Sequence, residues 1–134
     1  MSDTANRILQ LSAQGYCCSQ IMVRLGLDSL EEDNPNLVDA VAGLCGGLCS
    51  GLCCGTLTGA ACLLSMFDKE TARSHMIPSL VEWFQATYTP LYGGIDCRCI
   101  VGADGGLQYE RCPAIMEETV ARCRSLLAGF GYRL

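Results

Sequence analysis

The sequence contains almost no histidine, because only His75 occurs among its 134 residues. The Cys-x-x-Cys-His pattern that attaches c-type haem does not occur, so a c-type haem is not expected. No Cys-x-x-Cys pair occurs either, although the chain has 11 cysteines. The familiar local spacings of zinc sites and ferredoxin clusters are therefore missing, and any metal ligands must come from segments far apart in the sequence.

Positive charge is also scarce. The basic side chains are eight arginines and one lysine, Lys69, and they are scattered along a chain whose formal net charge is −5. Without a basic cluster the chain has no electrostatic footprint for nucleic acid, so no nucleic-acid partner is expected. The first residues show no basic region followed by an apolar core, which is what a secretory signal would need. We therefore expect a cytoplasmic protein.

Charge is missing altogether from the 28 residues between Asp39 and Asp68, a length that could span a bilayer. The stretch holds six glycines and five cysteines, and acids rather than a basic anchor flank it. No membrane span is expected for this reason, and a buried central segment of a soluble bundle is the preferred interpretation. Half of the 134 residues are apolar, enough for a hydrophobic core, and we predict a single domain over residues 1–134.

Alternation of apolar and polar residues, the mark of a half-buried strand, is not found in any segment. The segments between glycine and proline breakers have helical spacing instead. We predict an all-α fold, a compact bundle of about five to six helices with a central glycine- and cysteine-rich helical segment. The expected helices cover residues 4–14, 18–26, 36–50, 55–67, 79–88 and 113–128.

Glycine and cysteine recur every fourth residue in the central segment. The repeated positions are Gly43, Gly47, Gly51, Gly55 and Gly59, with Cys45, Cys49 and Cys53. On a helix, such a row forms one face that lets another backbone, a cofactor or a second copy of the chain in a homodimer approach closely. Each glycine costs roughly 1 kcal/mol of helix stability relative to alanine. The same glycines therefore equally suggest that the helix breaks near Gly51. Close packing with cysteines as small buried fillers is the alternative to a ligand role.

The 11 cysteines are the unusual feature of the composition. Cytoplasmic thiols stay reduced, and clustered cysteines there are more often metal ligands or catalytic groups than structural bridges. The odd number also rules out complete pairing within one chain. A disulfide scaffold is therefore the weaker expectation.

Four cysteines share one local setting, because each follows a chain breaker and precedes a helical run: Cys18, Cys54, Cys97 and Cys112. A helix start offers free backbone amides and the positive end of the helix dipole, and both favour the thiolate. Four thiolates brought together repel one another unless a cation neutralises them. Soft thiolates favour iron–sulfur clusters, zinc or Cu(I), so we predict that these four cysteines bind a metal or cofactor.

Several motifs carry a resemblance to a known family, and they run in the same order. Residues 15–20, Gly-Tyr-Cys-Cys-Ser-Gln, are similar to a Gly-Tyr-x-Cys-Ser/Ala-Gln opening. Residues 54–59, Cys-Gly-Thr-Leu-Thr-Gly, resemble a Cys-Gly-Ala-x-x-Gly signature, and residues 97–102 resemble a Cys-Arg-x-Leu-x-Gly element. With Cys112 as the fourth cysteine, the chain resembles the redox-active cysteine proteins of the C_GCAxxG_C_C family over most of its length.

The resemblance implies a cytosolic redox role and carries the four defining cysteines onto Cys18, Cys54, Cys97 and Cys112. A related module, fused to an unusual c-type cytochrome, is thought to hold an iron–sulfur cluster. Thr56 departs from the usual alanine of the signature. Seven further cysteines are not family hallmarks, and several of them could act as additional ligands. Those additional candidates are Cys17, Cys45, Cys49, Cys53 and Cys99.

The expected function is that of a redox protein with an iron–sulfur cluster at the four cysteines, in electron transfer or redox sensing with an unidentified redox partner protein. A redox protein is favoured over a substrate-converting enzyme. A bundle that binds or stores Cu(I) or zinc is one alternative, motivated by Cys45, Cys49 and Cys53 on one helical face. A metal-free thiol–disulfide protein, with Cys17–Cys18 or Cys53–Cys54 as attacking and resolving groups, is the other.

Overall fold

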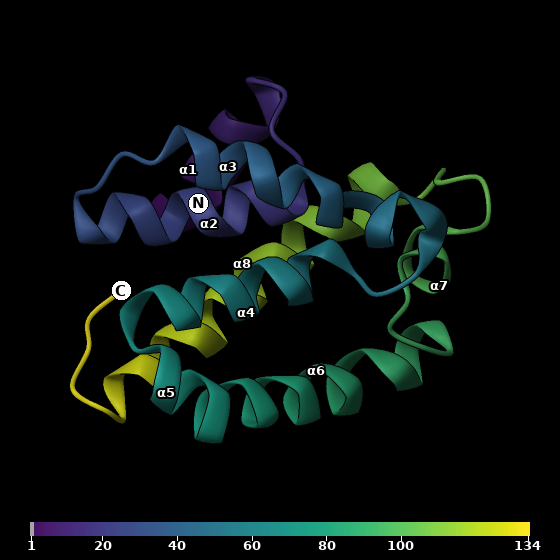
Figure 1. Ribbon diagram of the computed structural model, residues 1–134. Coiled ribbons are helices and arrows are strands. Elements are labelled where there is room, and N and C mark those ends of the chain that lie inside the picture. Colours follow the sequence, from purple (N-terminus) through teal and green to yellow (C-terminus); the bar gives the residue numbers. More distant parts are fainter. Residues whose placement is uncertain (1) are drawn as a thin grey trace.

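The computed structural model describes residues 2–134, and the predicted all-α class is confirmed within them. The main helices are α1 (Asp3–Ala13), α2 (Cys18–Leu30), α3 (Pro35–Ala40), α4 (Gly55–Phe67), α6 (Ile77–Tyr92), α7 (Cys97–Val101) and α8 (Gln108–Ala128). Short turns join them: η1 (Val41–Leu44), η2 (Gly47–Gly51), α5 (Lys69–Thr71) and η3 (Ala72–Met76). Figure 1 shows α2 and α3 as one layer and α6 as the opposite layer, with α4 between them and α8 behind α4.

Helix α4 packs closely against α2 because its glycines leave no side chain between the two backbones. A Cβ atom built on Gly59 would lie 2.7 Å from the Cα atom of Ser19 and 2.9 Å from its carbonyl oxygen. No larger residue fits at this position unless one helix moves. The expectation that the glycine row admits another backbone is therefore confirmed at Gly59.

The central segment departs from the predicted helix over residues 36–50. The chain leaves α3 through η1 and then turns into the left-handed region, with φ of 62° at Gly46, 60° at Leu48 and 57° at Cys49. Regular helix resumes only at Gly55, which confirms the predicted bounds of the helix over residues 55–67. The prediction of one helical face carrying Cys45, Cys49 and Cys53 is wrong, because glycines in this run favour a left-handed turn over a costly helix interior. The predicted break near Gly51 is confirmed.

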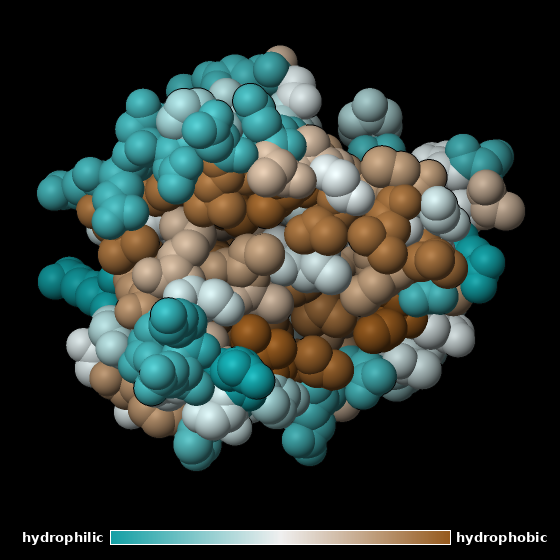
Figure 2. Space-filling model, viewed as in Figure 1, coloured by the Kyte–Doolittle hydropathy of each residue, from teal (hydrophilic) through white to brown (hydrophobic). Residues whose placement is uncertain are grey.

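The long uncharged stretch is thus divided among short elements. Among residues 2–134, no helix combines the length and the apolar character that crossing a membrane requires. Apolar side chains nevertheless remain on the surface, and Figure 2 shows them gathered on the face between α3 and α6. Leu48 and Leu52, on the turn before α4, are among the exposed large apolar residues.

The hydrophobic core lies mainly between α4, α6 and α8. Phe84 and Tyr88 on α6 are fully buried, with ring centroids 4.7 Å apart. Helix α6 is longer than the predicted helix over residues 79–88, because it continues through Pro90 and ends at Gly93, whose φ is 79°. Smaller clusters join α1 to α2 and α8, and α2 to α3. These contacts fix the end of the bundle at which α2, α4, α7 and α8 bring cysteines together.

Candidate functional site

The four predicted ligand cysteines lie near one another at one end of the bundle, although they come from four different elements. Cys18 is the first residue of α2, Cys54 caps the start of α4, and Cys97 is the first residue of α7. Cys112 lies on α8. In addition to burial, the charge of Cys18 raises the pKa of each of the other three thiols. The helix-start positions predicted for the first three cysteines are confirmed.

The approach of Cys18 to the start of α4 depends on Gly55. A Cβ atom at this position would lie 2.5 Å from the Cys18 Sγ atom and 2.9 Å from the carbonyl oxygen of Leu44. Glycine directly after Cys54 therefore leaves the space in which the Cys18 sulfur lies. This is the physical reason for a Cys-Gly pair at the start of α4.

A short backbone pairing positions α7. The amide of Cys97 donates to the carbonyl of Leu52 over 2.6 Å, and Cys53 forms an isolated antiparallel bridge with Asp96. The same pairing brings the first residue of α7 beside the segment that leads into Cys54. Two sulfur-bearing elements from distant parts of the chain are thus joined through their backbones rather than through side chains.

Cys112 does not lie at a helix start, which corrects the prediction of a helix over residues 113–128. Helix α8 begins at Gln108, so Cys112 lies in its second turn, and Pro113 follows inside the helix. Proline suits the first turn of a helix, which is why the sequence favoured the later start. Arg111 links the first turn of α8 to α7 and α6. Its Nη1 atom donates to the Ile100 carbonyl over 2.8 Å, and its guanidinium lies over the Tyr92 ring.

Burial dominates the acid–base chemistry of these thiols. It raises the pKa of Cys54 to about 11, although the amides of Leu57 and Thr56 and the Thr56 hydroxyl act in the opposite direction. Burial, followed by the charges of Cys54, Cys18 and Cys97, raises the pKa of Cys112 to about 12. Burial and Cys18 also raise the pKa of Cys97. A group of thiolates at this site therefore needs a positively charged group to hold it.

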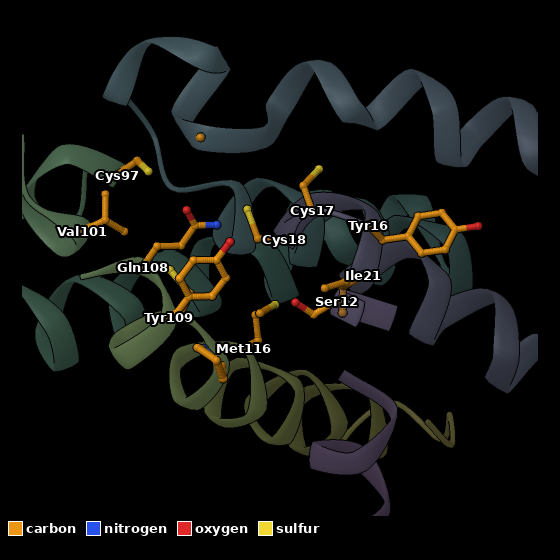
Figure 3. Close-up of a pocket in the computed structure, with 13 residues that line it drawn as sticks. Ser12, Tyr16, Cys17, Cys18, Ile21, Cys97, Val101, Gln108, Tyr109 and Met116 are labelled. Atoms are coloured by element: carbon orange, nitrogen blue, oxygen red, sulfur yellow. The ribbon is translucent and has the colours of Figure 1, made fainter. Parts of the chain in front are cut away.

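A cavity of about 100 Å³ opens beside the site, and Cys18, Cys97 and Cys112 line it. Figure 3 shows Gln108 and Tyr109 in the space between Cys97 and Cys18. The Tyr109 side chain belongs to the cavity lining while the residue is 85% exposed, so the cavity reaches the surface there. Cys54 is buried and does not line the cavity.

The donor set suits a soft metal group by its chemistry, because it consists of four thiols, of which Cys54 is buried and the other three are partly buried. Among residues 2–134, however, no three cysteine, histidine, aspartate or glutamate side chains stand close enough together to hold one metal ion. A single zinc ion would draw its four sulfurs to within about 3.8 Å of one another, since each Zn–S bond is about 2.3 Å long. A 4Fe–4S cluster would not need the four sulfurs to meet at one point, because each of its thiolates binds a different iron atom.

A disulfide between Cys17 and Cys45 is the feature that sequence reasoning missed. The bond links the residue before α2 to the residue after η1, with the two Cα atoms 6.0 Å apart. The partners are 28 residues apart, and no spacing pattern in the sequence pairs them. The pairs considered for a thiol–disulfide protein, Cys17–Cys18 and Cys53–Cys54, are not bonded to each other.

The remaining cysteines are free thiols in different settings. Cys49 is exposed, and Cys53 is half-buried beside Asp96, with its pKa raised first by burial and then by that carboxylate. Cys123 is buried in the core, where burial raises its pKa to about 12. His75 is exposed and hydrogen-bonds with the Ser74 hydroxyl over 2.7 Å.

One comparison with known proteins finds a match. A family described as "Putative redox-active protein (C_GCAxxG_C_C)" matches residues 16–126, a span that contains all four predicted ligand cysteines. No curated protein and no solved structure matches the chain significantly.

Proposed function

Because the chain belongs to the C_GCAxxG_C_C family of redox-active proteins, we propose that Cys18, Cys54, Cys97 and Cys112 hold an iron–sulfur cluster that serves electron transfer or redox sensing. The observation that carries the proposal is that four thiols from four separate elements lie near one another, with the Cys18 sulfur against the start of α4 that Cys54 caps. The pKa of Cys112 rises to about 12 through burial and through the charges of the other three. Thiolates in such a group are stable only around a cation, and soft iron supplies it.

The protein's own residues set the surroundings of the sulfurs. A bound cluster would supply one-electron redox chemistry. The amides of Leu57 and Thr56 and the Thr56 hydroxyl act to lower the pKa of Cys54, and groups that favour the thiolate also favour the more negative sulfur of the reduced state. Burial of Cys54 excludes water from that side of the site. Thr56, the departure from the family signature, thus adds a donor that alanine lacks.

The free thiols support the proposed location, and the cavity and the net charge support the proposed partner. Nine of the 11 cysteines are free, which supports a reducing compartment such as the cytoplasm. The cavity reaches the surface near Tyr109, so electrons need cross only a short distance to a redox partner protein docked there. The acidic net charge of −5 suits a partner with a basic surface.

The two metal alternatives have less support. Storage of Cu(I) was motivated by Cys45, Cys49 and Cys53 on one helical face, and the left-handed turn removes that face. Cys45 is also bonded to Cys17. A zinc site would require the four sulfurs to move towards one point. Both alternatives therefore need a rearrangement of these segments.

Metal analysis of protein purified without oxygen tests the proposal. We expect iron and acid-labile sulfide in comparable amounts, with visible absorption that dithionite bleaches. Replacing Cys18, Cys54, Cys97 or Cys112 singly with serine should remove most of the iron. Cys62→Ser is the matched control, because Cys62 is a half-buried thiol outside the four, and it should keep the iron content of the wild type.

Three outcomes would count against the assignment. Protein that folds but contains neither iron nor sulfide, also after reconstitution with ferrous iron and sulfide, would contradict the cluster. Stoichiometric zinc in its place would point to the alternative site. Equal iron loss in Cys62→Ser and in the four variants would show that the effect is on folding rather than on ligation.

A further inference from the structure

The sulfur atoms of the Cys17–Cys45 disulfide each face a side-chain oxygen. The Cys17 Sγ atom lies 3.3 Å from the Oε1 atom of Gln20, and the Cys45 Sγ atom lies 2.9 Å from the Oγ atom of Ser19. Ser19 is fully buried, so its hydroxyl has no water as a substitute partner. The disulfide itself is half-buried, and Cys17 lines the cavity beside Cys18.

Both oxygens are fixed as hydrogen-bond acceptors towards the sulfurs. The Nε2 atom of Gln20 donates to the Val38 carbonyl over 3.0 Å, which turns its Oε1 atom towards Cys17. The single proton of the Ser19 hydroxyl is donated to the Val41 carbonyl over 2.7 Å, so this oxygen can only accept from Cys45. A disulfide sulfur carries no proton, whereas a thiol does. Both contacts are therefore completed as hydrogen bonds only when the two cysteines are reduced.

We propose that Cys17 and Cys45 form a reversible dithiol–disulfide centre, distinct from the four-cysteine site and exchanging electrons with an external dithiol. In reduction, a thiolate of the external dithiol attacks one sulfur of the pair, and its second thiol then resolves the mixed disulfide. The Cys17–Cys45 bond breaks and one disulfide forms in the reductant. Two electrons and two protons pass to the protein, where one S–H faces Gln20 and the other faces Ser19.

The position of the pair gives this centre a structural effect. Cys17 precedes Cys18 directly, and Cys45 is followed by the left-handed turn at residues 46–49. Of residues 46–51, only Gly47 is buried, so few core contacts hold this turn. The disulfide therefore determines how firmly the start of the turn is attached to the start of α2.

A thiol titration of the whole protein tests the proposal. Anaerobic samples are equilibrated in mixtures of reduced and oxidised dithiothreitol, trapped with an alkylating agent, and mapped by peptide mass spectrometry. We expect Cys17 and Cys45 to become alkylated together, along one reversible two-electron curve, while circular dichroism stays that of the folded protein. Iron content does not enter this readout, so its failure and the failure of the cluster are distinguished.

Ser19→Ala tests the acceptor argument. Loss of the oxygen that faces Cys45 should shift the equilibrium towards the disulfide by about two- to fivefold, the effect of one weak hydrogen bond. Ser65→Ala is the matched control, because the Ser65 hydroxyl also donates to a backbone carbonyl, that of Ala61, over 2.9 Å. It should leave the equilibrium unchanged. Gln20→Leu provides the second measurement and should shift the equilibrium in the same direction.

Three results would overturn the proposal. The first is alkylation of Cys17 and Cys45 only after the protein unfolds, which would make the bond purely structural. The second is pairing of Cys17 with Cys18 in the oxidised samples. The third is an unchanged equilibrium in folded Ser19→Ala and Gln20→Leu, since both acceptors would then be irrelevant to the reduced state.

Discussion

Replacing Gly59 with alanine tests the close packing of α4 on α2 at its narrowest point. The new Cβ atom would lie 2.7 Å from the Ser19 Cα atom, and this backbone atom would have to retreat by about 0.7 Å to reach the 3.4 Å at which ordinary contact begins. Backbone atoms cannot rotate away as a side chain can. The two helices must separate, and the contact of Met22 with α4 loosens as well.

The expected magnitude is the difference between two opposing effects. Overpacking of this kind lowers the free energy of unfolding by about 1–3 kcal/mol, whereas alanine in place of glycine within a helix raises it by about 1 kcal/mol. We expect a net loss of about 1 kcal/mol in the free energy of unfolding. With a urea m-value of about 2 kcal/mol/M, the unfolding midpoint should fall by about 0.5 M.

Equilibrium urea unfolding, followed by circular dichroism at a fixed concentration of reductant, measures this shift. Gly43→Ala is the matched control, because Gly43 lies in η1 without a positive φ, and a Cβ atom added there would meet nothing within 4 Å. The control should be as stable as the wild type or slightly more stable. A Gly59→Ala midpoint at or above that of the wild type would refute the packing argument.

Three further substitutions probe single interactions. Tyr88→Phe removes the 3.0 Å hydrogen bond from a buried hydroxyl to Glu118, and calorimetry should show a loss of about 1 kcal/mol in unfolding free energy. Thr56→Val removes one of the groups that lower the pKa of Cys54, so the pH at which Cys54 in the metal-free protein reacts with an alkylating agent should rise; an unchanged profile would contradict a bond from this hydroxyl. Asp68 has its pKa lowered, first by the Thr71 amide and also by the Tyr132 hydroxyl. The ionised Asp68 carboxylate therefore stabilises the folded protein fully above pH 3.8, and this stabilisation is lost as the pH falls through the lower pKa of the folded state. Unfolding midpoints measured between pH 2 and 6 should depend less on pH in Asp68→Asn than in the wild type.

Local sequence signals predicted the regular helices well. The helix over residues 55–67 has the predicted bounds, because a glycine after Cys54 and the acidic residue Asp68 mark its two ends clearly. The early part of α8 was missed because Pro113 suits a first helical turn, and tertiary contacts of Arg111 hold an extra turn before it. Propensity alone does not register such contacts.

The left-handed turn and the disulfide lay beyond what the sequence could predict. Leu48 and Cys49 adopt positive φ angles, a conformation that neither residue type favours and that only the surrounding glycines indicate. The pairing of Cys17 with Cys45 was equally unpredictable, since the two residues are 28 positions apart in the sequence. For the four candidate ligands, the helix-start argument selected cysteines that do lie near one another, and their binding of a metal stays a prediction.

The backbone pairing of Leu52 and Cys53 with Asp96 and Cys97 has a consequence for the biosynthesis of the protein. A ribosome releases the chain from its N-terminus, so Cys18 and Cys54 emerge well before the strand-like segment that holds α7 in place. Before Cys97 has been synthesised, Leu52 and Cys53 have no partner for this backbone pairing. The entropy cost of closing the long loop is then not offset by any contact. Cys112 follows later still. A cluster held by all four sulfurs could therefore be completed only in a chain synthesised past α7 and into α8.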